Sequence, residues 1–161
     1  MSVTGRTKET DAVAESVCSI ERSVDIIGER WSFLILREAL IYGVTKYSDF
    51  QSSLGISTNI LVDRLNRIVS AGVLEKRMYQ EEGSRPRASY HPTPSGEALK
   101  LVLAALQQWG DDFNPPKDGV TFNRRTIGED RPVRVGFVDD NNEPRDIDDI
   151  AFVRTSLHPP R

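Results

Sequence analysis

The sequence predicts a mainly α-helical fold with a small amount of β-structure, a winged helix-turn-helix. Three observations support this class. A short helix, a glycine turn and a polar-faced helix follow one another between residues 47 and 71. A basic hairpin follows between residues 73 and 91, and a long apolar helix then runs to residue 113. This order of elements is typical of the winged helix-turn-helix, here with a long C-terminal dimerisation helix and a short β appendage.

Length and composition suit one compact domain with a small extension. The chain has 161 residues, of which 38% are hydrophobic and 28% charged. We expect a flexible N-terminus over residues 1–12, a main domain over residues 13–113 and a β-rich extension over residues 114–161. No apolar run reaches the roughly 18 residues that a membrane span needs, and no apolar signal segment opens the chain. We therefore expect a cytoplasmic protein without a membrane partner.

Cysteine and histidine are too few for a metal site. Cys18 is the only cysteine, so an internal disulfide is excluded, and His91 and His158 lie far apart in the sequence. The sequence therefore predicts no metal and no cofactor.

Two helices are expected at the start of the main domain. Val13, Val17, Ile20, Val24 and Ile27 recur at steps of four and three residues, which predicts one helical stripe. Gly28 interrupts this pattern. The segment 29–40 is rich in Leu and Ile and contains Trp31, which predicts a buried second helix.

The next segment predicts two helices joined by a turn. Residues 47–53 form the short helix, and Gly55 suits a turn residue with positive φ. Ser57 is a good N-cap for the following helix, and Gly72 ends it. Its predicted inner face consists of Leu61, Leu65, Ile68 and Val69. Its outer face consists of Thr58, Asn59, Val62, Asp63, Asn66 and Arg67.

A hairpin and a long helix complete the main domain. Residues 73–79 and 87–91 are predicted strands around a polar turn, and Thr93-Pro94 predicts a helix start. The helix carries a stripe formed by Leu99, Val102, Leu106, Trp109 and Phe113. Leu101, Leu103 and Ala105 widen the apolar arc beyond one face, so we expect a second packing partner.

The last third of the chain differs in character. Asn114-Pro-Pro-Lys-Asp-Gly119 should break the long helix. Beyond it, residues 120–124, 131–138 and 150–154 resemble short strands, with a turn at residues 139–144. These segments predict a small β appendage.

The charge distribution is compatible with double-stranded DNA as partner. The net charge is −3, but residues 46–91 contain seven basic and five acidic residues. The outer face of the helix after Ser57 can hydrogen-bond to base edges or phosphates, although an ordinary solvated face would look similar. The residues expected to contact DNA are Lys46, Ser57, Thr58, Asn59, Arg64, Asn66, Arg67, Arg85 and Arg87.

Many spaced positions resemble the HxlR-type regulators. The similarity begins with Cys18-Ser-Ile-Glu-Arg and Gly28-Glu-Arg-Trp31 and covers about residues 15–113. It continues through Tyr47-Ser-Asp-Phe50, Leu54-Gly-Ile-Ser57, Leu61, Arg64-Leu65, Gly72-Val-Leu, Tyr79, Arg85-Pro-Arg87, Tyr90, Thr93-Pro-Ser-Gly96 and Trp109-Gly110. Two departures stand out: Glu29-Arg30 replaces the usual Gly-Lys pair, and the extension lacks the cysteine pairs of some relatives.

The resemblance implies a homodimeric winged helix-turn-helix transcription regulator of bacterial type. Its dimers pair through the N-terminal and long C-terminal helices, here through Val13, Val17, Ile20, Val102, Leu103, Leu106 and Trp109. Several members use a cysteine at the position of Cys18 to sense oxidants or electrophiles, although lone cysteines are more often buried hydrophobes. Arg22, four residues on, is expected on the same helix face as Cys18.

Three functions remain in competition. The leading one is a DNA-binding regulator, a repressor, that recognises an inverted repeat as a homodimer and is switched through Cys18. A regulator gated by a non-covalent aromatic effector near Trp31 or Trp109 is an alternative, although core packing is the commoner role of such tryptophans. A protein-interaction module that has lost DNA binding is another. We do not expect an enzyme, because the sequence contains no nucleophile–base constellation, paired carboxylates or phosphate loop.

Overall fold

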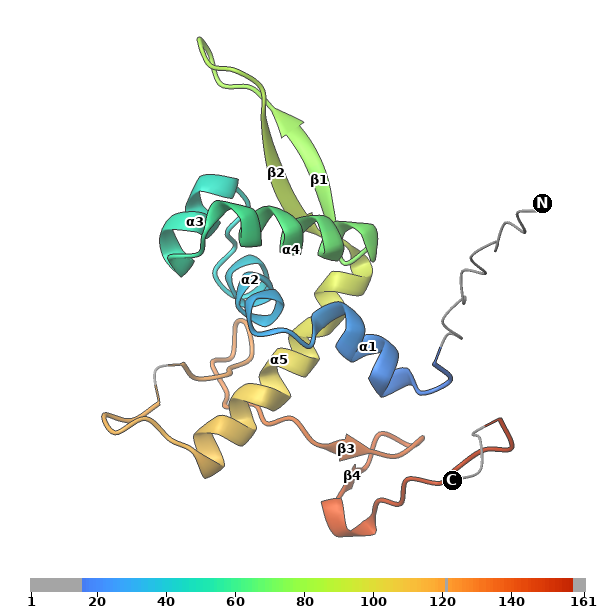
Figure 1. The fold of residues 1–161 in the computed structure, drawn as a ribbon. Helices are drawn as coiled ribbons and strands as arrows, with labels where there is room; N and C mark the ends of the chain where they lie inside the picture. The colour runs from blue at the N-terminus through green and yellow to red at the C-terminus, as the bar shows by residue number, and fades with distance from the viewer. Residues whose placement is uncertain (1–15, 121, 158–161) are drawn as a thin grey trace, which may run out of the picture.

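A computed structural model describes residues 16–120 and 122–157 (Figure 1). Five α-helices, a hairpin and a C-terminal arm follow in order. The helices are α1 (Ser19–Ile27), α2 (Arg30–Leu40), α3 (Tyr47–Leu54), α4 (Thr58–Ser70) and α5 (Pro94–Phe113). The strands are β1 (Leu74–Tyr79), β2 (Arg87–Pro92), β3 (Phe137–Val138) and β4 (Pro144–Arg145), and a 3-10 turn spans Ile147–Asp149. The predicted winged helix-turn-helix class is confirmed.

Helix α1 begins later than the apolar stripe predicted. It starts at Ser19, so Val17 precedes it as an exposed residue, while Val13 and the predicted flexible segment 1–12 lie outside the described residues. Gly28 separates α1 from α2. A larger residue would not fit there, because a Cβ would lie 2.5 Å from the Val24 carbonyl oxygen. Only Ile27 of α1 is buried, so this helix lies on the surface of the domain.

The core forms around α2, which contacts α1, α3, α4, α5 and β2. Ile35 and Leu36 of α2 are almost fully buried, as are Phe50 of α3 and the predicted inner residues Leu61 and Leu65 of α4. Burial of these side chains is the main stabilising contribution, at roughly 1.5–3 kcal/mol each. The apolar core therefore fixes α4 with one face inward and the other toward solvent.

The hairpin is an antiparallel ladder from Leu74 opposite Pro92 to Tyr79 opposite Arg87. The segment before α3 pairs briefly with β2, since the Tyr90 amide donates to the Thr45 carbonyl at 2.8 Å. Figure 1 shows the hairpin projecting beyond α4, at the opposite end of the molecule from β3 and β4.

Thr93 starts α5 as predicted. Its hydroxyl accepts from the Gly96 amide at 3.2 Å and donates to the Gly72 carbonyl at 2.6 Å. Gly96 permits this close approach, because a Cβ there would lie 2.1 Å from the Val73 carbonyl oxygen. The first turn of α5 is thereby fastened to the base of the hairpin.

The C-terminal arm contains less β-structure than predicted. Residues 150–154 and the described part of 120–124 form no strand, and only the last two residues of 131–138 do. The arm is instead fixed to α5 by side chains: Gln108 exchanges two 2.9 Å hydrogen bonds with the Val135 backbone, and Arg134 pairs with Asp112 at 2.7 Å. Residues 131–138 were predicted to pair with another strand, but the backbone of Val135 pairs with a side chain of α5 instead.

Across the described ranges, no helix has both the length and the apolar character to cross a membrane.

Candidate nucleic-acid interface

The turn between α3 and α4 fixes where the polar helix begins. Gly55 ends α3 with φ +59°, in the left-handed region that glycine adopts without strain. Ser57 is the N-cap residue of α4, but its side chain makes no capping bond. The Gln51 amide donates instead to the Thr58 hydroxyl at 2.9 Å, which ties the first turn of α4 to α3.

The outer face of α4 presents polar groups to solvent. Ser57, Thr58 and Asn59 are exposed at its N-terminus, and Asn66 is exposed two turns further along, about 10 Å from Asn59 along the axis. Asn59 and Asn66 thus share one face and offer amide donors and acceptors of the kind that bind base edges.

Two apolar side chains on α4 belong to the same exposed surface. Ile60 and Val62 are both exposed, although they are large hydrophobic residues. Exposed methyl groups can contact the thymine methyl group in a major groove. The periodicity of the inner face could have indicated Ile60, because this residue falls outside the stripe of Leu61, Leu65 and Ile68.

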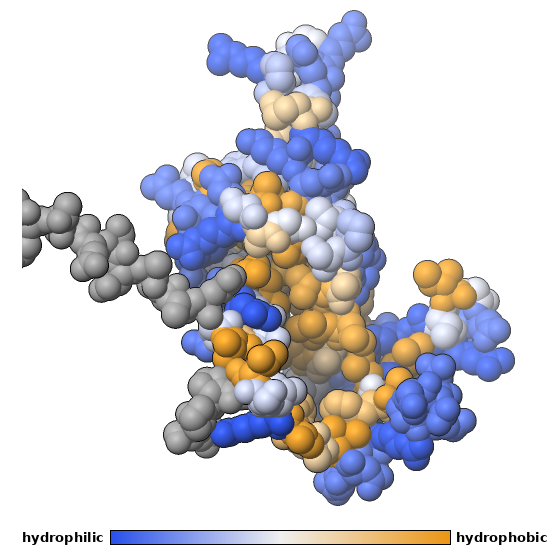
Figure 2. All heavy atoms as spheres, turned by 90° about the vertical axis from the view of Figure 1, so that its right-hand side faces the viewer, coloured by the Kyte–Doolittle hydropathy of each residue, from blue (hydrophilic) through white to orange (hydrophobic). Residues whose placement is uncertain are grey.

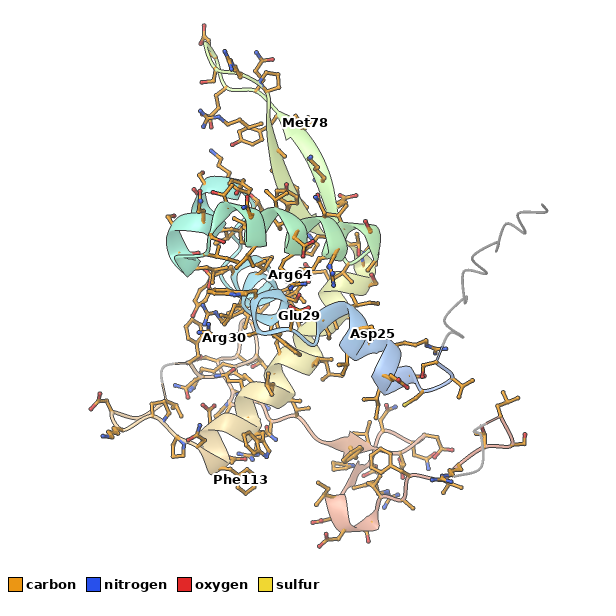
Figure 3. The ribbon with its side chains drawn as sticks, viewed as in Figure 1. Asp25, Glu29, Arg30, Arg64, Met78 and Phe113 are labelled. Carbon is orange, nitrogen blue, oxygen red and sulfur yellow. The ribbon has the colours of Figure 1, made fainter. Side chains whose placement is uncertain are left out.

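Arg64 lies in a different position from that expected of a DNA contact. Its side chain is only 16% exposed and forms an ion pair with Glu29, the residue that precedes α2 (Figure 3). Its Nη1 lies 3.4 Å from the Asp63 carboxylate, and its buried Nε has no hydrogen-bond partner. Arg64 therefore connects α4 to the start of α2.

Arg67 lies at the edge of the same group but remains accessible. Its Nε is 3.4 Å from Asp63 and its Nη1 is 3.9 Å from Glu29, while its side chain is 59% exposed. Glu29 thus pairs with both arginines. In the sequence, Glu29 stood out only as a departure from the HxlR-type pattern. Its ion pairs with Arg64 and Arg67 join distant segments, so no local sequence pattern indicates them.

Lys46, another expected DNA contact, is held by an acidic residue of the hairpin turn. Its Nζ donates to Glu81 at 2.8 Å and lies 5.3 Å from the centre of the Tyr79 ring. This hydrogen bond raises the pKa of Lys46 and lowers the pKa of Glu81. The side chains of Lys46 and Glu81 are 44% and 51% exposed, so solvent screens the pair and phosphate can compete for the lysine.

The hairpin itself carries cations with no acidic partner. Arg85, Arg87 and Lys76 are exposed and form no ion pair within residues 16–120 and 122–157, whereas Arg77 donates to Glu75 at 2.8 Å. Lys76 was missed as a candidate, because the alternation of β1 places it on the same face as the buried Leu74, and only its exposure in the structure makes it a candidate. The hairpin lies at the same end of the molecule as α4 (Figure 1), and its register places Lys76 and Arg87 on opposite faces of the two-stranded ladder.

Cys18, the predicted sensor, is the N-cap residue of α1 rather than part of the helix. It is partly buried, and its backbone amide donates to the Ser16 hydroxyl at 3.1 Å. Arg22 lies one turn further along, since its amide donates to the Cys18 carbonyl at 3.1 Å. Its guanidinium donates to the Ser16 carbonyl and the Ser19 hydroxyl, at 3.4 and 3.2 Å, so an effect of Arg22 on the Cys18 thiol stays a prediction.

The residues expected at a dimer interface divide into two groups. Ile20, Val17, Val102 and Leu106 are exposed, and Trp109 is 59% exposed, so core packing of Trp109 is wrong for the single chain. Leu103 is only 8% exposed and lies in the core of its own chain, so the structure places it away from that surface. Trp31 is partly buried against the core, as the core interpretation predicted.

Among the residues whose placement is described, no group of three or more His, Cys, Asp or Glu side chains is arranged to hold a metal ion.

Comparison with known proteins identifies similar sequences and folds. Residues 26–118 match the model of the HxlR-like helix-turn-helix family. The uncharacterised HTH-type transcriptional regulator Rv3095 of Mycobacterium tuberculosis is 34% identical over 113 residues, covering 69% of this chain and 70% of the relative.

Two solved structures resemble nearly the whole chain. PA1607, described as a candidate transcription factor, has a TM-score of 0.74 at 33% identity and covers 88% of this chain and 97% of its own. PA1374 of Pseudomonas aeruginosa, described likewise, has a TM-score of 0.60 at 30% identity and covers 88% and 95%. The likeness therefore extends beyond the helical domain into the C-terminal arm.

Proposed function

The chain belongs to the HxlR-like helix-turn-helix family of transcription regulators, and from this premise we propose that it is a homodimeric repressor that binds an inverted-repeat operator. The proposal rests mainly on the exposed polar face of α4. This helix follows Gly55, which has a left-handed backbone conformation, and it lies at the same end of the molecule as the basic hairpin. A helix presented in this way enters a major groove with its N-terminus first.

Within this proposal, different residues have different tasks. Ser57, Thr58, Asn59 and Asn66 contact base edges, because they are exposed and polar. Arg67, Lys46, Arg85 and Arg87 bind phosphates, for which Lys46 and Arg67 exchange their present carboxylate partners. We assign Arg64 to positioning α4, since its guanidinium is already bound to Glu29.

A second copy of the chain supplies the symmetry. Figure 2 shows a band of hydrophobic side chains below the hairpin, on the side where α1 faces the viewer. Exposed residues of α1 and α5, among them Ile20, Val24, Leu106, Trp109 and Phe113, support its use as a dimer interface. Monomeric proteins rarely expose a contiguous apolar surface of this kind. A two-fold dimer would place its recognition helices about 34 Å apart, one turn of DNA.

The proposed geometry supports repression as the sign of regulation. A dimer bound across two successive major grooves can exclude polymerase from an overlapping promoter without any further surface. We therefore propose repression of an adjacent gene.

Cys18 is the proposed point of control. It lies next to Val17 and Ile20 at the start of α1, so a bulky adduct on its sulfur would disturb the proposed dimer face. The proposal predicts that diamide or an electrophile releases DNA from the wild-type protein but not from Cys18→Ser. Equal release from both proteins would refute the thiol switch.

A gel shift on the upstream intergenic DNA tests the proposed function. The wild-type protein should bind, and Arg85→Ala combined with Arg87→Ala should weaken binding to all sequences and reduce its dependence on salt. Arg145→Ala on the arm is the matched control. Binding that ignores the hairpin substitutions would exclude the hairpin from the interface, and the absence of any binding would favour the interaction-module alternative.

A further inference from the structure

A cavity of about 280 Å³ lies between α2 and α5 and plays no part in the proposed DNA interface. Helix α2 contributes Phe33, Leu34 and Arg37 to its wall, and α5 contributes Leu103 and Gln107. Phe122, from the C-terminal arm, lines the cavity as well. Its walls are mostly apolar, and its size is near the lower limit for small-ligand sites.

Phe122 is held in place by several contacts. Its ring packs edge-to-face on Tyr42 with centroids 5.4 Å apart, and its carbonyl accepts a 2.9 Å hydrogen bond from Gln107. Edge-to-face pairing of this type stabilises the two rings against each other. The arm therefore completes a site that the helical domain alone would leave open.

Arg37 supplies one charged donor at this site. Its Nε and Nη2 donate to the same oxygen of Glu38, at 3.1 and 2.6 Å, and its guanidinium lies 5.6 Å from the centre of the Tyr42 ring. Within the described residues, Nη1 of Arg37 donates to no acceptor. Glu38 is buried and already balances the arginine charge, so a second carboxylate would be repelled while a neutral acceptor would not.

We propose that this cavity binds a small planar aromatic compound bearing a neutral carbonyl group, with the carbonyl accepting from Nη1 of Arg37. The apolar walls accommodate the ring, and the balanced Arg37–Glu38 pair selects a neutral acceptor over an anion. This position differs from the surroundings of Trp31 and Trp109, neither of which lines the cavity.

Occupation of the cavity would act on both ends of the molecule. One side of α2 lines the cavity, while its buried residues Ile35 and Leu36 belong to the core shared with α4. The cavity also touches α5 at Leu106, a residue of the proposed dimer face. A ligand here would therefore shift α4 relative to the dimer helix. This regulatory role rests on the proposed function. The binding of a ligand in the cavity does not depend on the proposed function.

Calorimetric titration of the full chain without DNA tests the site. Acetophenone is the probe, ethylbenzene lacks its acceptor, and benzoate carries a charge. Acetophenone should bind about tenfold or more tightly than either, since its carbonyl gains a charge-assisted hydrogen bond. Arg37→Lys, which keeps the charge beside Glu38, should reduce acetophenone affinity to that of ethylbenzene. Arg145→Lys on the arm is the matched control.

A second variant guards against a folding defect in Arg37→Lys. Phe122→Ala removes a wall and should weaken all three probes together, while circular dichroism stays unchanged. No acetophenone binding up to millimolar concentration would overturn the proposal. So would equal binding of acetophenone and ethylbenzene to the wild-type protein. Because DNA is absent, these outcomes are independent of whether the chain binds an operator.

Discussion

Asn59 and Leu65 lie on opposite faces of α4, and each face has one task. Leu65 is fully buried, whereas Asn59 is exposed at the N-terminal turn. The 3.6-residue period of the helix made this division predictable, because apolar residues at steps of four and three must share a face. The ion pair of Arg64 with Glu29 was not predictable, since nothing local in the sequence relates two segments so far apart.

Asn59→Ala tests the polar face. The fold should remain intact, because the side chain is exposed, but specific DNA binding should weaken by about 1–3 kcal/mol through loss of a base contact. Fluorescence anisotropy with operator and scrambled DNA measures both affinities, and Ser70→Ala at the far end of α4 serves as control. Unchanged discrimination between the two DNAs would place the recognition face elsewhere.

Leu65→Asp tests the buried face. The substitution removes a fully buried side chain and introduces an unpaired charge, so we expect a loss of at least about 4 kcal/mol of unfolding free energy. Chemical denaturation followed by circular dichroism measures it. Val62→Asp, at an exposed position of the same helix, should cost far less. Similar stabilities for the two variants would contradict the assigned core.

At the scale of elements, local signals predicted the helices and the hairpin well. Gly55, Gly72 and Thr93-Pro94 mark boundaries that the structure reproduces, because they encode backbone geometry directly. Within the arm, the sequence of residues 131–138 predicted a strand, but the Gln108 side chain of α5 binds the Val135 backbone instead. A strand needs a partner, and the sequence does not say where that partner lies.

Glu81 in the turn of the hairpin pairs with Lys46, one of the proposed phosphate contacts. Glu81 has a lowered pKa because Lys46 donates to it, so this contribution to stability is present above the unfolded-state pKa of the carboxyl. It is lost as the pH falls through the folded-state pKa. Lys46 has the opposite shift, and its contribution is lost as the pH rises through its own raised pKa. At neutral pH the two groups are paired.

Glu81→Gln should release Lys46 for phosphate. We expect tighter DNA binding at low salt, because Lys46 then binds phosphate without first leaving a carboxylate, and a steeper plot of log affinity against log salt, because one negative charge is removed beside the DNA. Filter binding across a salt series measures the slope. Glu82→Gln removes an adjacent carboxylate that forms no ion pair within the described residues, and it should have the smaller effect. Identical slopes for the two variants would exclude Lys46 from the interface.

At the scale of the whole molecule, apolar side chains of α1 and α5 remain uncovered by the rest of residues 16–120 and 122–157. Val24, Leu106 and Phe113 are exposed although they are large and hydrophobic. The sequence indicated this excess on the long helix, because its apolar arc exceeded one face. The sequence did not predict which residues of α5 remain exposed. Leu103 was assigned to the dimer surface, whereas it belongs to the core of its own chain.

Leu106→Glu should weaken the proposed dimer without unfolding the chain. The side chain is 52% exposed in the single chain, so a charge is tolerated there but not inside an apolar interface. Sedimentation equilibrium measures the association constant, and Lys100→Glu, off this stripe of α5, controls for added negative charge. An unchanged mass for Leu106→Glu would exclude this face as the interface.

Hydroxyl-radical footprinting of the upstream intergenic DNA tests the central claim most directly, that two copies bind DNA through α4 and the hairpin. We expect two protected stretches related by two-fold symmetry, with centres about 10–10.5 base pairs apart. With the Asn59→Ala variant, both stretches of DNA should lose their protection together. A single protected stretch, symmetric stretches at another spacing, or protection unaffected by Asn59→Ala would contradict it.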